Sequence, residues 1–332
     1  MAAGIASAMS SCESFVYDEE GDCAPDFKVR FRYDYNLLHA DAFSHEVNAV
    51  TLYVIDPVTG YIVWQQTESG EALRADDYLM DLDGLNPGDY KLMAWAGDGH
   101  ISPEHFTLTD GVSFDELTCT INRRDPSRAG AIVDQDLPRL YKDLPEEFEE
   151  TRTFVPDQGV HIHTVRLMRN TNDIHIVLQN LSGEPLDPAD FEYEITASNG
   201  SMNWDNSLLP DEELTYKPWQ IRAGLATGYV PDNLAEAQFS AAIADFTVGR
   251  MVTTDRMTLR ITQRADGSVV AQIPVIDYAL MVKGHYDAMP DQEYLDRQTD
   301  YSMVFFLDSN QRWLATQIFI NSWHVVLNPT EL

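Results

Sequence analysis

Short segments in which apolar and polar residues alternate recur along this chain, and they limit the folds it can adopt. The clearest segment is residues 26–35, where every second residue is aromatic or a valine and most of the others are charged. A period of two places the apolar residues on one face of a β-strand and the charged residues on the other. We therefore predict a half-buried strand over this segment.

The same pattern continues with turn residues at regular intervals. Residues 48–56 and 61–67 are two apolar runs separated by a turn that contains Pro57 and Gly60, which predicts a β-hairpin. Further short strands follow at a spacing of about 8–12 residues, which is typical of a β-sandwich or barrel. The clearest helical segment is residues 290–301, where Glu293 and Arg297 form a favourable i,i+4 pair. The predicted fold class is all-β, with short helical insertions.

The length of 332 residues suits two domains. Residues 123–156 are rich in charge and proline and poor in β-branched residues, so we predict a linker there. The predicted organisation is a leader and N-terminal tether at 1–25, a β-sandwich domain at 26–122, the linker, and a second β-sandwich domain at 157–332.

The charge of the chain excludes one class of partner. It has 54 acidic and 22 basic residues, a formal net charge of −32. A surface this negative repels a phosphate backbone, so nucleic acid is not an expected partner. The 44% of hydrophobic residues is enough for a buried core, and no run of 18 or more apolar residues predicts a membrane-spanning helix.

The three cysteines are informative because of their positions. The first twelve residues are mostly small and apolar and end at Cys12, which is typical of the end of a lipoprotein signal peptide, and we predict that Cys12 carries lipid. The alternative is an unstructured leader with a free thiol. In an exported protein, Cys23 and Cys119 can form a disulfide worth about 4–5 kcal/mol in the chain-entropy model. The alternative for this pair is two buried, reduced thiols.

Motifs for catalysis or cofactor binding are incomplete. His45 and Glu46 begin a zinc-protease pattern, but Ala49 occupies the position of the second histidine. His161 and His163 share one face of a predicted strand, although the sequence offers no third metal ligand beside them. No nucleophile elbow and no P-loop occurs. We therefore expect no catalytic residues, no metal site and no cofactor.

Several longer segments resemble a known family. They are CESFVYDEEGDC from residue 12, NAVTLYVID from residue 48, LNPGDYKLMAWAG from residue 85, EYLDRQTDYSMVFFLD from residue 293 and IFINSWHVVLN from residue 318. In these segments and in their order, the chain resembles the FimB-like anchor and assembly subunits of type V fimbriae of Bacteroides-type bacteria. The resemblance runs from Cys12 nearly to Leu332.

The resemblance implies two transthyretin-like β-sandwiches, a lipid on Cys12, and a surface-exposed position on the cell outer membrane. It also implies a role in tethering a fimbrium and in stopping or regulating its growth. The expected partners are fimbrial shaft or accessory subunits, which would pair with an open strand edge.

Two other functions remain open from the sequence. One is a fimbrial tip or shaft subunit. The other is a carbohydrate-binding surface lipoprotein, which would need exposed aromatic residues in a groove, for example at Trp64, Trp204 or Trp219.

Overall fold

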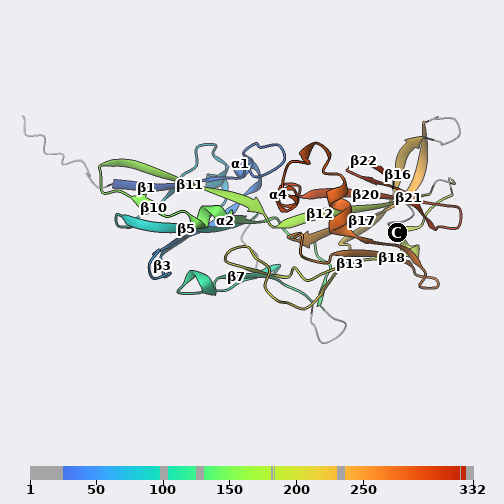
Figure 1. The fold of residues 1–332 in the computed structure, drawn as a ribbon, viewed down its shortest axis with the longest axis horizontal. Helices are drawn as coiled ribbons and strands as arrows, with labels where there is room; N and C mark the ends of the chain where they lie inside the picture. Colours follow the sequence, from blue (N-terminus) through green and yellow to red (C-terminus); the bar gives the residue numbers. More distant parts are fainter. Residues whose placement is uncertain are drawn as a thin grey trace, which may run out of the picture.

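The computed structural model describes residues 25–97, 104–124, 131–180, 182, 184–229, 236–321 and 323–326. The molecule is elongated and has two lobes that follow each other along its long axis (Figure 1). Strands dominate both lobes and the few helices are short, which confirms the predicted all-β class.

The N-terminal lobe is built on an eight-stranded sheet whose main path is β3-β2-β5-β9-β11-β1-β4, with β10 paired to β5. Its strands are β1 (Pro25–Arg32), β2 (Ala49–Ile55), β3 (Ile62–Ser69), β4 (Met80–Asp81), β5 (Gly88–Gly97), β9 (Leu140–Asp143), β10 (Arg152–Phe154) and β11 (Gly159–Arg169). A three-stranded sheet, β14-β7-β6, consists of β6 (Phe106–Leu108), β7 (Thr118–Ile121) and β14 (Ser201–Asn203).

The C-terminal lobe contains two further sheets. The first, in the order β16-β17-β12-β20-β21-β22, consists of β16 (Gln220–Tyr229), β17 (Glu236–Gly249), β12 (Thr171–Asn180), β20 (Asp300–Leu307), β21 (Trp313–Ile320) and β22 (Trp323–Val326). The second, in the order β19-β18-β13-β15-β8, consists of β19 (Val269–Pro274), β18 (Thr258–Gln263), β13 (Phe191–Ala197), β15 (Leu214–Tyr216) and β8 (Ala131–Val133).

Short helices lie between the strands. The α-helices are α1 (Phe43–Glu46), α2 (Pro145–Glu149), α3 (Val275–Met281) and α4 (Asp291–Arg297), and the 3₁₀-helices are η1 (Glu71–Arg74), η2 (Phe114–Glu116), η3 (Pro188–Asp190) and η4 (Gly284–Tyr286). Helix α4 confirms the helix predicted from residue 290, and the Arg297 Nε lies 2.8 Å from a carboxylate oxygen of Glu293 as expected.

The first predicted strand forms, but β1 ends at Arg32, whereas the prediction extends to residue 35. In β1, Phe27, Val29 and Phe31 are buried while their neighbours point outward. These side chains enter a core shared by β1, β2, β5 and β11, which also contains Leu52 and Leu167. Burial of such aliphatic and aromatic side chains contributes about 1.5–3 kcal/mol each.

A second, larger core joins the two lobes. Strand β2 is buried along its whole length, because each of its faces enters a core. Leu52 lies in the first core, whereas Tyr53 and Ile55 lie in the second. They belong to a cluster that includes Trp95 and Cys119 and continues without interruption to Phe305 in the C-terminal lobe.

The segment predicted as a linker is largely structured. Residues 123–156 contain β8, β9, α2 and β10. Strand β9 bridges β5 and β11 in the N-terminal lobe, whereas β8 pairs with β15 in the C-terminal lobe. Strand β11, which starts at Gly159, pairs with β1 over eight residues. The division into domains at 26–122 and 157–332 stays a prediction. Strand β8, from the predicted linker, belongs to a sheet of the C-terminal lobe, and β11, from the predicted second domain, belongs to the sheet of the N-terminal lobe.

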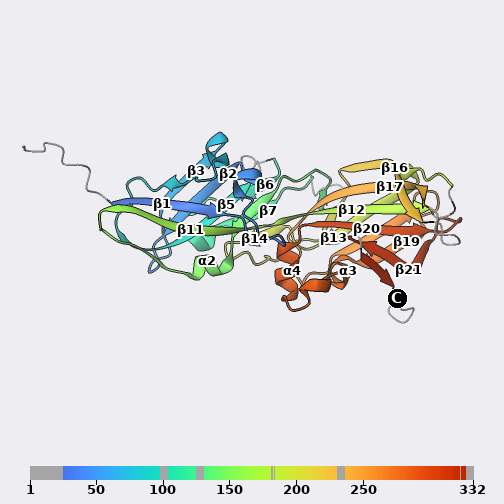
Figure 2. The same ribbon diagram turned by 90° about the horizontal axis from the view of Figure 1, so that it is seen from above.

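The two lobes are connected by a nearly continuous ribbon. Strand β11 ends at Arg169 and β12 begins at Thr171, so only Asn170 separates them, and Figure 2 shows the ribbon running along the long axis. Asn170 is fully buried and its backbone N–H donates to the Leu140 carbonyl at 2.7 Å. Its side-chain amide pairs with that of Asn206 through two hydrogen bonds of 2.6 and 3.1 Å.

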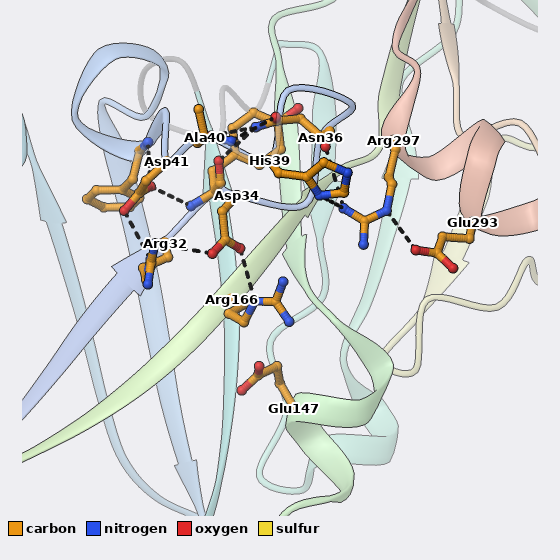
Figure 3. A network of polar contacts seen from close by, with 12 residues as sticks. Arg32, Asp34, Asn36, His39, Ala40, Asp41, Glu147, Arg166, Glu293 and Arg297 are labelled. Atoms are coloured by element: carbon orange, nitrogen blue, oxygen red, sulfur yellow. Dashed lines mark hydrogen bonds and ion pairs between the residues drawn. The ribbon is translucent and has the colours of Figure 1, made fainter. Parts of the chain in front are cut away.

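Ion pairs and polar contacts reinforce this junction. The Arg250 guanidinium binds both carboxylate oxygens of Asp296 in α4, each at 2.8 Å, and both residues are buried. On the neighbouring surface, the loop after β1 reaches α4, where the Arg297 guanidinium stacks 3.8 Å from the centre of the Tyr35 ring. The Arg297 guanidinium also lies close to His39 (Figure 3). The Arg250–Asp296 pair lies within the C-terminal lobe, and Arg250 also donates to the carbonyl of Asn206, the partner of Asn170. The cation–π contact of Arg297 with Tyr35 joins the two lobes directly and depends on their relative orientation.

We predict that Arg250→Ala lowers the free energy of unfolding by about 3–5 kcal/mol, because it leaves the Asp296 carboxylate buried without its partner. Urea denaturation followed by circular dichroism measures this change. The matched control is Arg256→Ala at an exposed position, for which we expect a change within about 0.5 kcal/mol. Equal effects of the two substitutions would contradict a stabilising role for the buried pair.

Candidate interaction surface

The predicted cysteine sites are only partly visible. Cys12 and Cys23 lie outside the described residues. Cys119 is a free thiol at the centre of β7, fully buried in the larger core, and burial raises its pKa. A thiol in this environment is unreactive, because the thiolate is the nucleophile. The lipid on Cys12 and the Cys23–Cys119 disulfide stay predictions.

The two histidines of β11 have ordinary structural partners. The His161 Nε2 lies 2.8 Å from the Asp157 carbonyl oxygen, and the His163 ring packs 4.3 Å from the centre of the Phe154 ring. Desolvation lowers the pKa of His163. In the described ranges, no group of three or more His, Cys, Asp or Glu side chains is arranged to hold a metal ion.

One buried ion pair lies deep between the sheets. Lys142 and Asp143 of β9 are about 1% exposed and contact each other, and the Lys142 ammonium lies 5.4 Å from the centre of the Trp95 ring. Desolvation lowers the pKa of Lys142 and raises that of Asp143. The Asp143 carboxylate also accepts a hydrogen bond of 2.7 Å from the Ala94 N–H. This hydrogen bond links β9 to β5. Because the Lys142–Asp143 pair is buried, a substrate cannot reach it.

The free edges of the sheets are the features best suited to binding another protein. An edge strand presents unpaired N–H and C=O groups that a partner strand can satisfy, and proteins usually protect such edges with polar or charged residues. Strand β3 follows this rule, because its second half is the polar run Gln65–Ser69. Strand β16, at the end of the six-stranded sheet, follows it only in part, because it carries the charged Arg222 but also exposes Ile221 and Leu225.

Strand β16 is ten residues long, and in the described part of the chain it pairs only with β17. Ile221 and Leu225 are 40% and 70% exposed. Ile221 is paired with Ala244, a fully buried core residue, and Ala223 is paired with Ala242, which is also fully buried. Paired residues project to the same face of a sheet. The exposed apolar side chains of β16 therefore lie on the core side of the sheet, beyond the area that the opposite sheet covers.

We call Trp219, Ile221, Ala223, Leu225 and the free edge of β16 the β16 surface. Trp219 precedes the strand and is 37% exposed, and its backbone N–H donates to the Asp245 carbonyl at 3.0 Å. Trp64 and Trp204, the other aromatics considered for a carbohydrate platform, are partly buried and pack against the two cores. Sequence patterns did not indicate β16, because its glycines and alanines weaken the strand signal.

Among the described residues, no helix is long and apolar enough to cross a membrane.

The chain is similar to known fimbrial and adhesive proteins. A family described as "Fimbrillin-A associated anchor proteins Mfa1 and Mfa2" matches residues 19–329. A candidate adhesin of Bacteroides thetaiotaomicron has a similar structure, with 32% sequence identity, a TM-score of 0.80, and coverage of 93% of this chain and 100% of the other.

Two further solved structures are similar. One is a candidate polysaccharide-binding protein of Bacteroides thetaiotaomicron, with 32% identity, a TM-score of 0.74, and coverage of 92% of this chain and 99% of the other. The other is the fimbrial anchor protein Mfa2 of Porphyromonas gingivalis, which shares the fold at 16% identity and a TM-score of 0.64, with coverage of 92% of this chain and 100% of the other. No curated protein matches the chain. The match over residues 19–329 confirms the resemblance identified from the sequence.

We predict that Leu225→Ala changes the free energy of unfolding by no more than about 0.5 kcal/mol, because this side chain is largely exposed. The matched substitution Leu259→Ala, at a fully buried position of β18, should cost about 2–5 kcal/mol. Urea denaturation of both variants measures the difference. A large loss of stability in Leu225→Ala would show that the β16 surface is covered within the monomer.

Proposed function

We propose that this chain, which belongs to the family of fimbrillin-A associated anchor proteins, is a lipid-anchored subunit that tethers a fimbrium to the outer membrane and limits its growth. The observation that carries the proposal is that β1 and β16 lie in different lobes. Strand β1 begins at the outer end of the N-terminal lobe, whereas β16 lies in the other lobe (Figure 1). The proposed lipid attachment before β1 and the proposed partner surface on β16 would therefore lie in different lobes.

The lipid would be carried by Cys12, thirteen residues before the start of β1. A segment of that length spans at most about 45 Å when extended. Because the segment leads into the outer end of the N-terminal lobe, the C-terminal lobe would be directed away from the membrane. Several acyl chains on one cysteine would make this attachment stable, whereas one chain binds only weakly.

The partner would pair with the free edge of β16. An extended segment added to this edge gains main-chain hydrogen bonds, and its apolar side chains gain contacts with Ile221 and Leu225. The partner would be a shaft or accessory subunit of the fimbrium.

The limit on growth would come from β1. This strand lies between β11 and β4, and its side chains fill the core of the N-terminal lobe. A subunit that loses its first strand opens a groove for the next subunit. An anchor whose first strand is attached to lipid keeps that groove closed, so the polymer ends there. The role we propose is structural and requires no catalysis.

We predict that Cys12→Ser releases the protein from the membrane fraction and leaves fimbriae detached, because the lipid would have no attachment site. Membrane fractionation and mass spectrometry of the N-terminal peptide provide the measurement. Cys23→Ser is the matched control and should remain in the membrane fraction. A mature N-terminus after an internal arginine, without lipid, would instead support the shaft or tip alternative.

We also predict that Leu225→Lys weakens capture of the fimbrial partner at least tenfold, because a charge would be placed among apolar contacts. Co-purification of fimbrial subunits with the membrane-extracted protein measures the effect. Val63→Lys is the matched control, since Val63 is 50% exposed on the other long edge strand, β3. Loss of capture in Val63→Lys alone would place the partner at β3.

A further inference from the structure

A pocket with a volume of about 680 Å³ lies where the two lobes meet. The N-terminal lobe contributes His45 and Arg74, and the C-terminal lobe contributes Asp173, His175 and Trp219. Its volume is in the range of small-molecule sites. We call it the junction pocket.

Three arginines lie in the lining of the junction pocket, in a chain that is strongly acidic. Three of the 22 basic residues of the chain, Arg74, Arg139 and Arg169, line it. Arg139 lies 3.1 Å from a carboxylate oxygen of Glu46, and Arg169 lies 2.6 Å from one of Asp173. These two arginines are therefore already paired.

Arg74 differs from the other two arginines. It is exposed, and its guanidinium donates one hydrogen bond of 3.1 Å to the Asn48 side chain. Within the described ranges, no carboxylate oxygen lies within 4 Å of it. A guanidinium in this state retains donors for the bidentate binding of a carboxylate.

The pocket also contains acceptors. One carboxylate oxygen of Asp136 lies 3.0 Å from the Thr247 hydroxyl, and no basic group of the described residues is within 4 Å of this carboxylate. His45 and His105 add ring nitrogens that can donate or accept. The lining therefore offers a cation for a carboxylate and several acceptors for hydroxyl groups.

Trp219 supplies an apolar surface in the same lining. Its backbone is held by Asp245, and its side chain is 37% exposed. An indole ring presents a flat apolar face against which the C–H groups of a sugar ring can pack.

We infer that the junction pocket binds an acidic sugar, with the ligand carboxylate on Arg74, hydroxyl groups on Asp136 and the histidines, and the sugar ring against Trp219. An acidic peptide fits less well, because its side chains offer few hydroxyl donors to Asp136 and the histidines. A neutral sugar would leave Arg74 without a counter-charge. This inference does not depend on the proposed anchoring role.

Binding of digalacturonate to the full chain, followed by saturation-transfer NMR and isothermal titration calorimetry, tests the inference. We expect the wild type to bind digalacturonate and to bind the uncharged galactose disaccharide of the same linkage at least tenfold more weakly. Arg74→Gln and Trp219→Ala should each weaken binding of digalacturonate at least tenfold. Arg256→Gln, the same charge change at an exposed position outside the pocket, should have no effect.

Three outcomes would overturn the inference. They are no binding of digalacturonate at about 10 mM, equal binding of the neutral disaccharide, and equal behaviour of Arg74→Gln and Arg256→Gln. A glutamate-rich peptide is tested in parallel. If it binds in the pocket more tightly than digalacturonate does, the pocket recognises a protein segment instead. Arg74 lies outside the β16 surface and far in the sequence from Cys12, so Arg74→Gln distinguishes failure here from failure of the anchoring role; Trp219, which the pocket shares with the β16 surface, is used only to test sugar binding.

Discussion

The passage of one ribbon through both lobes is the constraint on which the rest of the structure depends. Asn170 is the only residue between β11 and β12, and it is buried and paired with Asn206. A connection this short, with satisfied polar groups, leaves little freedom for the two lobes to move independently. The stacking of Arg297 on Tyr35 joins the lobes directly, and Arg250, paired with Asp296, also binds the carbonyl of Asn206 beside the connection. The molecule is elongated, with two lobes joined by a short, buried connection (Figure 1), which suits the proposed role of connecting a membrane to a polymer.

The β16 surface illustrates how a sandwich can leave apolar residues exposed at a sheet edge without losing its core. The alanines of β17 pack against the opposite sheet and are fully buried, whereas the paired residues of β16 extend beyond it. Small residues in β17 allow the sheets to approach closely, and the apolar residues of β16 are left on the same face in contact with water. A contiguous apolar edge of this kind is costly to expose in a monomer and is typical of an interface.

The parts of the fold that followed from the sequence are those with a strong local pattern. The alternation in β1 and the Glu293–Arg297 pair in α4 are local, and both elements form as predicted. Strand β9 was not predicted, because it is short and contains Lys142 and Asp143, whose burial depends on strands distant in the sequence. Strand β16 was missed because Gly224 and Gly228 weaken its pattern. The junction pocket was also invisible in the sequence, because its arginines come from separate segments and meet only when the lobes are assembled.

The central claim is that the fimbrial partner binds along β16, in the lobe that does not carry the proposed membrane attachment. A photoreactive amino acid placed at Leu225 in fimbriated cells, compared with the same amino acid at Val63, tests this claim most directly. The account predicts a crosslink to a fimbrial subunit from position 225 and none from position 63. A crosslink from position 63 alone would contradict it.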